Sequence, residues 1–255
     1  MGNSLELGIL RIIVNSYMYD KIDRIINEIL LIQKGEPFFS ALEKRISKLA
    51  GVEGERKEKG PKVEKVEISS KESLMRMLES EILECKKCPL HLRRTNAVPG
   101  TGNYNAKLMI IGEGPGRDED IQGKPFVGKA GKLLTQLLSE IGISREEVYI
   151  TNVVKCRPPD NRVPEESEIE ACRDYLRRQI EIINPKIILL LGSTALKAVI
   201  GEKSITKVRG EEIEIDGIIY LPTFHPAAVL RDESNKLSQI REDFRKLKEL
   251  YEKLA

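Results

Sequence analysis

Four short apolar segments alternate with longer segments of helical periodicity, and this alternation restricts the possible folds more than any other feature of the chain. The apolar segments are 107–111, 148–151, 186–191 and 218–221. Continuous apolar runs of this kind are typical of strands buried on both faces of a sheet. Helices are expected at 131–141, 165–183, 194–200 and 236–254. The pattern predicts an α/β fold with a central, mostly parallel four-stranded sheet and helices on both faces.

Glycine and polar residues follow the predicted strands. A Gly-Glu-Gly-Pro-Gly turn begins at Gly112, Asn152 comes directly after the second strand, and Ser193 and His225 come after the third and fourth. In an open parallel sheet, ligands bind beyond the carboxyl ends of the strands. We therefore expect these residues to share one edge of the fold.

The first 70 residues differ in character from the rest of the chain. The segment 1–52 contains two apolar series at helical or near-helical spacing, namely Ile22, Ile25, Ile26 and Ile29, then Phe39, Leu42, Ile46 and Leu49. Residues 53–70 are dominated by Lys and Glu, which is typical of a solvated linker. The sequence predicts a helical N-terminal extension at 1–52, a charged linker at 53–70 and a main domain at 71–255. We expect a monomer whose extension packs on the main domain or contacts another protein or a second copy.

Basic and acidic residues nearly balance, at 42 against 40, so the net charge of +2 neither indicates nor excludes a nucleic-acid partner. The apolar stretch 5–14 is short and contains Arg11, so it predicts neither a membrane span nor a signal sequence. A cytoplasmic protein with no membrane partner is expected. Abundant Lys, Glu and Ile, together with the absence of Trp, favour a thermophile as the source.

The four cysteines of the chain lie in two groups, the Cys85-x-x-Cys88 pair and Cys156 followed by Cys172. Four thiolates are sufficient to bind either a 4Fe-4S cluster or a structural zinc ion. A disulfide is the less favoured alternative, because a close Cys-x-x-Cys pair in a chain without a secretory signal more often binds metal. His91 could in principle be a zinc ligand, but four sulfurs suffice, and a surface position is the simpler interpretation.

The glycine turn that begins at Gly112 lacks the Gly-Lys-Ser/Thr ending of a phosphate-binding loop and the spacing of a dinucleotide motif. Its glycines would still let a planar ligand approach the backbone closely. The same loop carries four carboxylates. We interpret Asp118 and Asp120 as a solvated acidic turn, and keep Glu113 and Glu119 as candidate functional groups.

Three side chains near the strand ends are suited to hold a flat ring. Phe126 stands in a polar, glycine-rich loop, where it could either stack on a ring or anchor the core. The Asn152 amide offers a donor and an acceptor, which match the edge of a pyrimidine base. His225 is held by the proline that follows it. We expect these three side chains to converge around a single flat heterocycle.

Three groups of residues combine into a larger pattern. They are Glu-Gly-Pro-Gly from 113 with Gly-Lys-Pro-Phe-Val-Gly from 123, Thr-Asn-Val-Val-Lys-Cys-Arg-Pro-Pro from 151 with Asn161 and Arg162, and His-Pro-Ala-Ala-Val-Leu-Arg from 225. With all four cysteines in order, this pattern resembles the family-four uracil-DNA glycosylases, the thermophile-type, iron-sulfur branch of their superfamily. The resemblance extends from Leu83 to the C-terminus and does not cover the first 70 residues.

This resemblance implies an enzyme of base excision repair that flips deoxyuridine out of DNA and hydrolyses the bond between base and sugar, leaving an abasic site. It implies that the Phe126 ring stacks on uracil, that the Asn152 amide reads the polar edge of the base and that His225 donates to a uracil oxygen. The full set of residues implied to bind uracil is Gly112, Glu113, Gly114, Phe126, Asn152 and His225.

The resemblance does not specify the group that activates water, because Gly114 stands where other branches carry a carboxylate or an amide. Glu119 is the first candidate, and Glu113 and Asn161 are the alternatives. A group within one hydrogen bond of the water is the minimum requirement. Asn161 could equally be a turn residue.

The resemblance also implies where DNA would bind. Leu230 would enter the minor groove as an apolar wedge, and Arg231 would reach a phosphate. Further contacts are expected from Ser193, Lys155 and Arg157. Other basic residues in or near loops that could face the same backbone are Lys129, Arg162 and Arg209.

The cysteine order implies a 4Fe-4S cluster held by Cys85, Cys88, Cys156 and Cys172. Its expected role is structural, pinning the first loop to the loop that carries Asn152. The alternative from another class of protein is a non-catalytic DNA-binding module cross-linked by zinc or by an iron-sulfur centre. Metal content and activity would distinguish it from a glycosylase.

Overall fold

The computed structural model describes residues 70–201 and 204–253, so the predicted extension at 1–52 and all but the last residue of the predicted linker at 53–70 lie outside the described residues. Within those ranges, no helix is long and apolar enough to cross a membrane. The helices and strands are, in chain order, α3 (Lys71–Leu83), η1 (Pro89–Leu92), β1 (Thr101–Gly102), β2 (Leu108–Gly112), α4 (Arg117–Gln122), α5 (Lys129–Glu140), β3 (Tyr149–Asn152), η2 (Pro159–Asn161), α6 (Glu166–Ile183), β4 (Ile187–Leu191), α7 (Gly192–Ile200), α8 (Ile205–Val208), β5 (Ile213–Ile215), β6 (Ile218–Thr223), α9 (Pro226–Arg231) and α10 (Glu233–Lys253).

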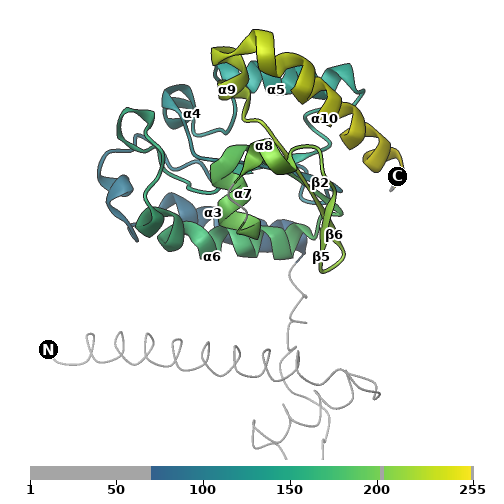
Figure 1. Cartoon of the computed structure of the whole chain (residues 1–255). Coiled ribbons are helices and arrows are strands. Elements are labelled where there is room, and N and C mark those ends of the chain that lie inside the picture. Colours follow the sequence, from purple (N-terminus) through teal and green to yellow (C-terminus); the bar gives the residue numbers. More distant parts are fainter. Residues whose placement is uncertain (1–69, 202–203, 254–255) are drawn as a thin grey trace, which may run out of the picture. The chain divides into compact units, whose positions relative to one another are not determined.

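The described strands form one six-stranded sheet in the order β1-β3-β2-β4-β6-β5 (Figure 1). The four central strands are parallel, and Ile110 of β2 lies opposite Ile150 of β3 and Leu189 of β4. These are the four strands that the sequence predicts, so the predicted parallel sheet is confirmed. The outer strands β1 and β5 pair antiparallel with β3 and β6, and the sequence does not predict them.

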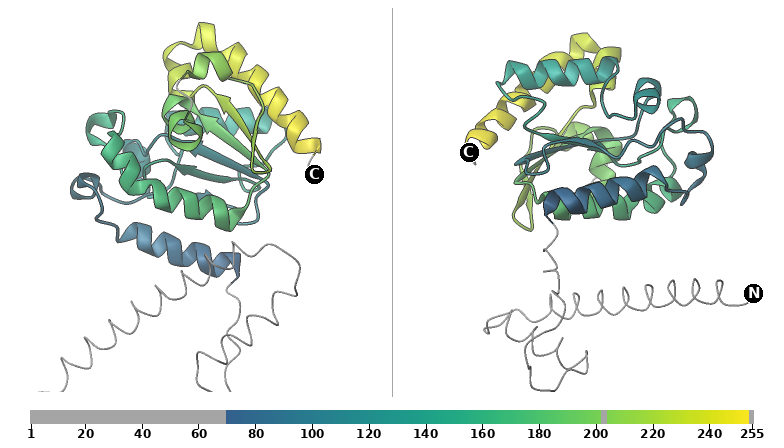
Figure 2. Two further views of the ribbon diagram at one scale, coloured as in Figure 1. Left: turned by 60° about the horizontal axis from the view of Figure 1, so that its bottom comes forward. Right: turned by 180° about the vertical axis from the view of Figure 1, so that it is seen from behind.

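Helices cover both faces of the sheet, as predicted. Helices α5, α9 and α10 lie on one face and α3 and α6 on the other, in Figure 1 and in both views of Figure 2. Successive side chains of β2 point to opposite faces. Met109 and Ile111 pack with residues of α3 and α6, whereas Leu108 and Ile110 pack with residues of α5 and α10. Two apolar cores, one on each face, therefore hold the central strands rigidly.

The outer strands are short and partly exposed, so continuous apolar runs do not reveal them. β1 has two residues. β5 joins β6 through Asp216 and Gly217, whose φ angles are 52° and 77°. An Asp-Gly pair between two apolar runs is a hairpin signal because both positions need a positive φ. The sequence therefore contained a signal for β5 that hydrophobic periodicity alone misses.

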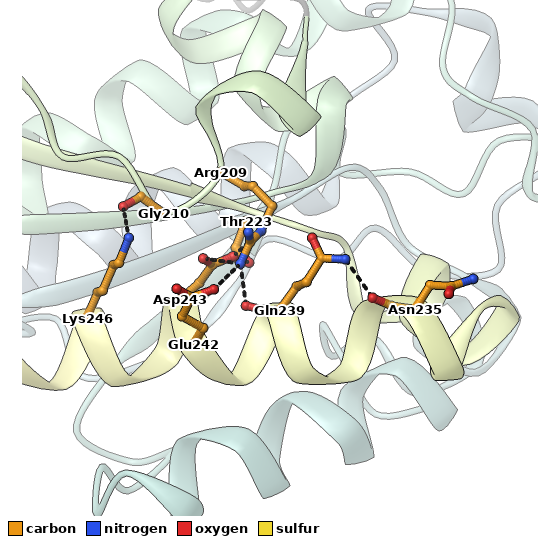
Figure 3. Close-up of polar contacts among 8 residues, drawn as sticks. All are labelled: Arg209, Gly210, Thr223, Asn235, Gln239, Glu242, Asp243 and Lys246. Carbon is orange, nitrogen blue, oxygen red and sulfur yellow. Dashed lines mark hydrogen bonds and ion pairs between the residues drawn. The ribbon is translucent and has the colours of Figure 1, made fainter.

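The buried carboxylate of Asp243 joins helix α10 to the end of β6 by a hydrogen bond and to Arg209 by an ion pair (Figure 3). Asp243 of α10 is fully buried and accepts a hydrogen bond from the Thr223 hydroxyl, at the end of β6, at 2.6 Å. Arg209 donates to the two carboxylate oxygens of Asp243 at 2.7 and 3.1 Å. The expectation that Arg209 faces a DNA backbone is wrong, because its guanidinium is committed to this pair and its side chain is only 17% exposed.

We expect Asp243→Ala to lower the free energy of unfolding by about 3–5 kcal/mol, because the change leaves a largely buried guanidinium without its partner. Thermal unfolding followed by circular dichroism should show a melting temperature lower by about 10 °C. Glu242→Ala is the matched control, since Glu242 pairs with the same guanidinium at 3.3 Å but has a side chain that is 57% exposed. Its removal should cost less than about 1 kcal/mol. Equal losses in the two variants would contradict the expectation.

Candidate active site

A pocket of about 540 Å³ lies at the carboxyl ends of the parallel strands. Residues at or after the end of each strand line it: Glu113 follows β2, Asn152 ends β3, Ser193 follows β4 and His225 follows β6. Among the residues that the sequence singles out, the lining contains Glu113, Gly114, Glu119, Phe126, Asn152, Asn161, Ser193, His225 and Arg231. The structure thus brings the aromatic ring, the amide and the imidazole together, as the sequence predicts.

Asn152 presents an unsatisfied acceptor to this pocket. Its side chain is 1% exposed, and Oδ1 has no hydrogen-bond partner among the described residues. Gly112, its register neighbour on β2, leaves room for it, because a Cβ at Gly112 would lie 2.5 Å from Asn152 Oδ1 and 2.5 Å from Phe126 Cζ. A buried acceptor without a partner costs about 1–3 kcal/mol. The pocket is therefore built for a ligand that donates a hydrogen bond at this point.

Phe126 combines the two roles that its sequence position allows. It is 6% exposed, packs with residues of α5 and has a positive φ of 52°. Helix α5 approaches its backbone so closely that a Cβ at Gly131 would lie 1.9 Å from Phe126 O. The ring also lines the pocket, with its centroid 5.6 Å from that of His225. The core anchor therefore fixes an aromatic ring at the edge of the pocket.

His225 caps helix α9 and lines the pocket. Its Nδ1 accepts a hydrogen bond from the Ala227 amide at 3.1 Å, so in the neutral ring the hydrogen lies on Nε2. Burial lowers the pKa of His225 from 6.5 to about 4, and the positive charge of Arg231 adds to this effect. The pocket therefore holds a neutral imidazole whose Nε2–H can donate to a ligand near neutral pH.

Glu119, the first candidate for water activation, ties two loops of the pocket together. Its Oε1 accepts hydrogen bonds from the Val127 and Gly128 amides, both at 2.9 Å, and its Oε2 accepts from the Gly116 amide at 3.2 Å. Three backbone donors occupy most of the acceptor positions of one carboxylate. Glu119 therefore holds the loop that carries Phe126.

Glu113 and Asn161 each interact with one polar side chain. The Thr194 hydroxyl donates to the Glu113 carboxylate. Arg157 Nε donates to Asn161 Oδ1 at 2.7 Å. Asn161 has a positive φ of 55° at the end of η2, as suits the turn residue considered from sequence. Glu113, with one such donor against the three of Glu119, keeps more acceptor capacity for a water molecule in the pocket.

Five residues form the main predicted DNA contact, and all but one of them are at least partly exposed. Arg231 and Ser193 are exposed and line it, and Leu230 is a 44% exposed residue of α9. Arg157 is partly exposed and is held by Asn161. Their DNA contacts stay predictions.

The exception is Lys155, for which the prediction is wrong. Its exposed fraction is 1%, and its Nζ donates to the Thr151 hydroxyl, the Asn152 carbonyl and Gln179 Oε1, each at 2.7 Å. The loop after β3 turns inward, so that residues 153–156 are all buried. Burial lowers the pKa of Lys155 from 10.5 to about 7. A basic residue in a polar-looking loop is thus directed into the interior.

The structure also corrects the predictions made for Asp120 and Arg162. Asp120 is not solvated: it is 3% exposed, and its Oδ1 accepts from the Thr95 and Asn96 amides at 2.9 and 3.3 Å. It therefore ties the segment after the first cysteine pair to α4. Arg162 lines the pocket, but its guanidinium donates twice to the buried carboxylate of Glu168, at 2.7 and 2.8 Å. Neither side chain stands out in the sequence as a structural element.

The four cysteines come together away from this pocket, around one small cavity lined by Cys85, Cys88, Cys156 and Cys172. All four are free thiols. His91 is not simply a surface residue, because it also lines the cavity and its Nδ1 lies 2.8 Å from the Cys88 carbonyl oxygen. In the described part of the chain, no group of three or more His, Cys, Asp or Glu side chains is placed so that it could hold one metal ion.

The donors around these sulfurs suit thiolates. Arg94, which the sequence does not mark, donates to Cys156 Sγ at 3.0 Å, and the Lys155 amide donates to Cys172 Sγ at 3.4 Å. Burial raises the pKa of Cys172 to about 11 and also raises that of Cys156. A metal would have to displace these protons on binding. Four cysteines with charged and amide donors beside them form a donor set that fits an iron-sulfur centre, which does not need its four sulfurs around one metal ion as zinc does.

Comparison with known proteins agrees with this site. Residues 99–254 match the family model of the uracil DNA glycosylase superfamily. A type-4 uracil-DNA glycosylase of Thermotoga maritima is 52% identical over 188 residues, which cover 72% of this chain and 98% of the relative. One from Sulfurisphaera tokodaii is 53% identical over 183 residues (68% and 83%), and one from Archaeoglobus fulgidus is 46% identical over 179 residues (67% and 89%). The chain therefore belongs to the uracil-DNA glycosylase superfamily and, within it, to the type-4 uracil-DNA glycosylases.

Proposed function

We propose that this protein excises uracil from DNA by hydrolysing the bond between the base and the sugar. The unsatisfied Oδ1 of Asn152 carries the proposal, because uracil offers the matching donor, its N3–H, beside an O4 that can accept from the same amide. A site built to hydrogen-bond a ligand discriminates strongly against one that lacks the matching group.

The base reaches this pocket only outside the duplex, at a cost of about a few kcal/mol for unstacking and unpairing. Stacking on the Phe126 ring and hydrogen bonds to Asn152 offset that cost. Leu230 fills the space that the base leaves, and Arg231, Ser193 and Arg157 contact the phosphate backbone. Arg231 is exposed and lines the pocket, and its neighbour Leu230 is 44% exposed, which supports these roles.

Water attacks C1′ of the sugar, the C1′–N1 bond breaks, and its electron pair leaves with uracil, through a transition state that resembles an oxocarbenium ion. The proton that the water loses is in the end taken up by the departing uracil anion, so the products are uracil and an abasic site. The Nε2–H of His225 donates to uracil O2, where negative charge collects. A donor aimed at developing charge contributes about 3–4 kcal/mol. We assign the orientation of this water to Glu113, and its position in the pocket lining, with one side-chain donor on its carboxylate, supports this role. Glu119 and Asn161 are the second choices, since their side-chain oxygens already accept hydrogen bonds from other residues of the loops.

The four cysteines are proposed to hold a 4Fe-4S cluster. Bound there, it supplies Fe–S bonds that cross-link the segment after α3 to the loop after β3 and to α6, and the hydrolysis needs no electron from it. The cysteines themselves reach the cavity from these three places. Their role is to hold the loop after Asn152 in a fixed position relative to the rest of the pocket.

A direct test uses a duplex oligonucleotide with one uracil, incubated with the protein and then treated with alkali. Strand scission at the uracil position, and none in the thymine-containing duplex, is the expected result. Binding of both duplexes without scission would instead favour the non-catalytic DNA-binding module.

We expect Cys172→Ala to purify with less than half of the wild-type iron and to unfold at a lower temperature, because one Fe–S bond and one link between the segments are lost. Iron analysis and thermal unfolding check this, and about four irons per wild-type chain are expected. One zinc per chain in place of iron would reject the cluster and leave a zinc staple.

A further inference from the structure

Lys155 is a buried lysine whose three donors are all used within the protein. Its Nζ has three acceptors at 2.7 Å, namely the Thr151 hydroxyl, the Asn152 carbonyl and Gln179 Oε1. The Thr151 hydroxyl gives its own hydrogen to the Pro99 carbonyl at 2.7 Å, so toward Lys155 it acts as an acceptor. Three acceptors match the three hydrogens of an ammonium group.

No carboxylate balances this charge: none of the ion pairs between residues in 70–201 and 204–253 includes Lys155. Removing an ammonium group from water is costly, and a nearby negative charge lowers that cost. Lys155 lines the cavity of the four cysteines, and its own amide donates to Cys172 Sγ. A 4Fe-4S cluster bound by the four thiolates would carry a net negative charge, because its sulfides and the thiolates together outweigh the irons, and the ammonium would balance that charge.

The same ammonium acts on the base pocket through the backbone. It donates to the carbonyl of Asn152, the last residue of β3, whose side chain presents the unsatisfied Oδ1 to the pocket. Cys156 is the next residue after Lys155, so one short segment carries the base-reading amide, the ammonium and a cysteine of the cavity. A change at Lys155 is therefore expected to affect both the cavity of the four cysteines and the base pocket.

We infer that Lys155 is a positioning residue that couples the cysteine cluster to base recognition, by fixing the Asn152 carbonyl and by balancing the charge of the thiolates. The inference rests on the proposed function for the part that concerns uracil. The part that concerns the cluster can be measured without the reaction.

The test compares Lys155→Met with wild type, both loaded with iron. We expect the reduction midpoint of the cluster to fall, because loss of a neighbouring positive charge disfavours the more negative, reduced state. The inhibition constant for free uracil should rise about 10–100-fold, as is usual when a partner that orients a ligand-binding residue is removed. The dissociation constant for uracil-containing DNA should stay within about twofold, because most of that affinity comes from phosphate contacts.

Gln179→Met is the matched control. Gln179 is fully buried and takes part in the same network, but its loss leaves both the ammonium and its bond to Asn152. We expect this variant to keep the wild-type midpoint and the wild-type affinity for uracil. Equal changes in the two variants would mean general loosening and would overturn the inference, as would a Lys155→Met protein with unchanged midpoint and unchanged uracil affinity.

If Lys155→Met takes up no iron, Lys155→Arg replaces it, because arginine keeps the charge but not the geometry. The expected result is a wild-type midpoint with weakened uracil binding. A shifted midpoint with wild-type uracil binding would overturn the inference. A wild-type protein that releases no uracil from DNA would reject the proposed function instead, and the comparison of midpoints would still stand.

Discussion

Replacing Asn152 by alanine is expected to lower the single-turnover rate of uracil excision by about 10³-fold or more, while the affinity for DNA changes little. The amide is the group in the pocket with an unsatisfied buried acceptor, and uracil would supply its missing partner. A site with such a group loses both the stabilising bond and the discrimination that depends on it. Single-turnover rates measured with saturating enzyme report the excision step, and a separate binding titration reports the affinity for DNA.

Asn103→Ala is the matched control for this prediction. Asn103 is exposed, lies outside the pocket, and its Oδ1 accepts a hydrogen bond from the Asn105 amide within a turn. The control should excise uracil at the wild-type rate. An Asn152→Ala protein that retains a tenth or more of the wild-type rate would remove the basis of the proposed base recognition.

Replacing His225 by alanine is expected to lower the excision rate by about 10²–10³-fold, because the departing uracil loses the donor aimed at its developing charge. The effect should lie in the maximal single-turnover rate and not in the affinity for DNA. His225→Gln should recover part of the loss, since its amide can still donate to the same oxygen. A glutamine variant no better than alanine would argue that the ring serves only to cap α9.

The pH dependence follows from the lowered pKa. With a pKa of about 4, His225 is neutral at higher pH and already carries its hydrogen on Nε2. The ratio of wild-type to His225→Ala rates should therefore be constant between about pH 5 and 8, because the neutral ring with its Nε2–H predominates over that whole range. A ratio that falls as the pH rises through 6.5, the ordinary pKa, would show that a cationic imidazole is the active form instead.

Much of the pocket could be predicted from the sequence because the relevant signals are local. The buried runs fix the parallel strands, and the strand ends fix where Asn152 and His225 emerge. The two outer strands were not predicted, because β1 is only two residues long and β5 depends on an Asp-Gly turn rather than on hydrophobic periodicity. The role of Glu119 was not predicted either, because the sequence around a loop carboxylate is the same whether it binds water or accepts hydrogen bonds from three backbone amides.

The direction in which a charged side chain points was the least predictable property. Lys155, Asp120 and Arg209 all sit in segments rich in polar residues, which favours exposure, yet Lys155 and Asp120 are buried and Arg209 nearly so. Their partners are distant in the chain, as with Asp243 for Arg209 and Gln179 for Lys155. No local pattern can report a partner that only the packing of helices on the sheet brings near.

The sequence by itself determined the parallel α/β core, the edge at which the pocket forms and the family of the chain, because apolar runs and short motifs act over a few residues. Only the tertiary structure decided which charged side chains are buried in the interior and which are exposed near the pocket. It also showed that a lysine beside the cysteines is buried against Asn152, the residue proposed to read the base. Burial and long-range hydrogen bonds set these outcomes, and both depend on how segments far apart in the chain pack together.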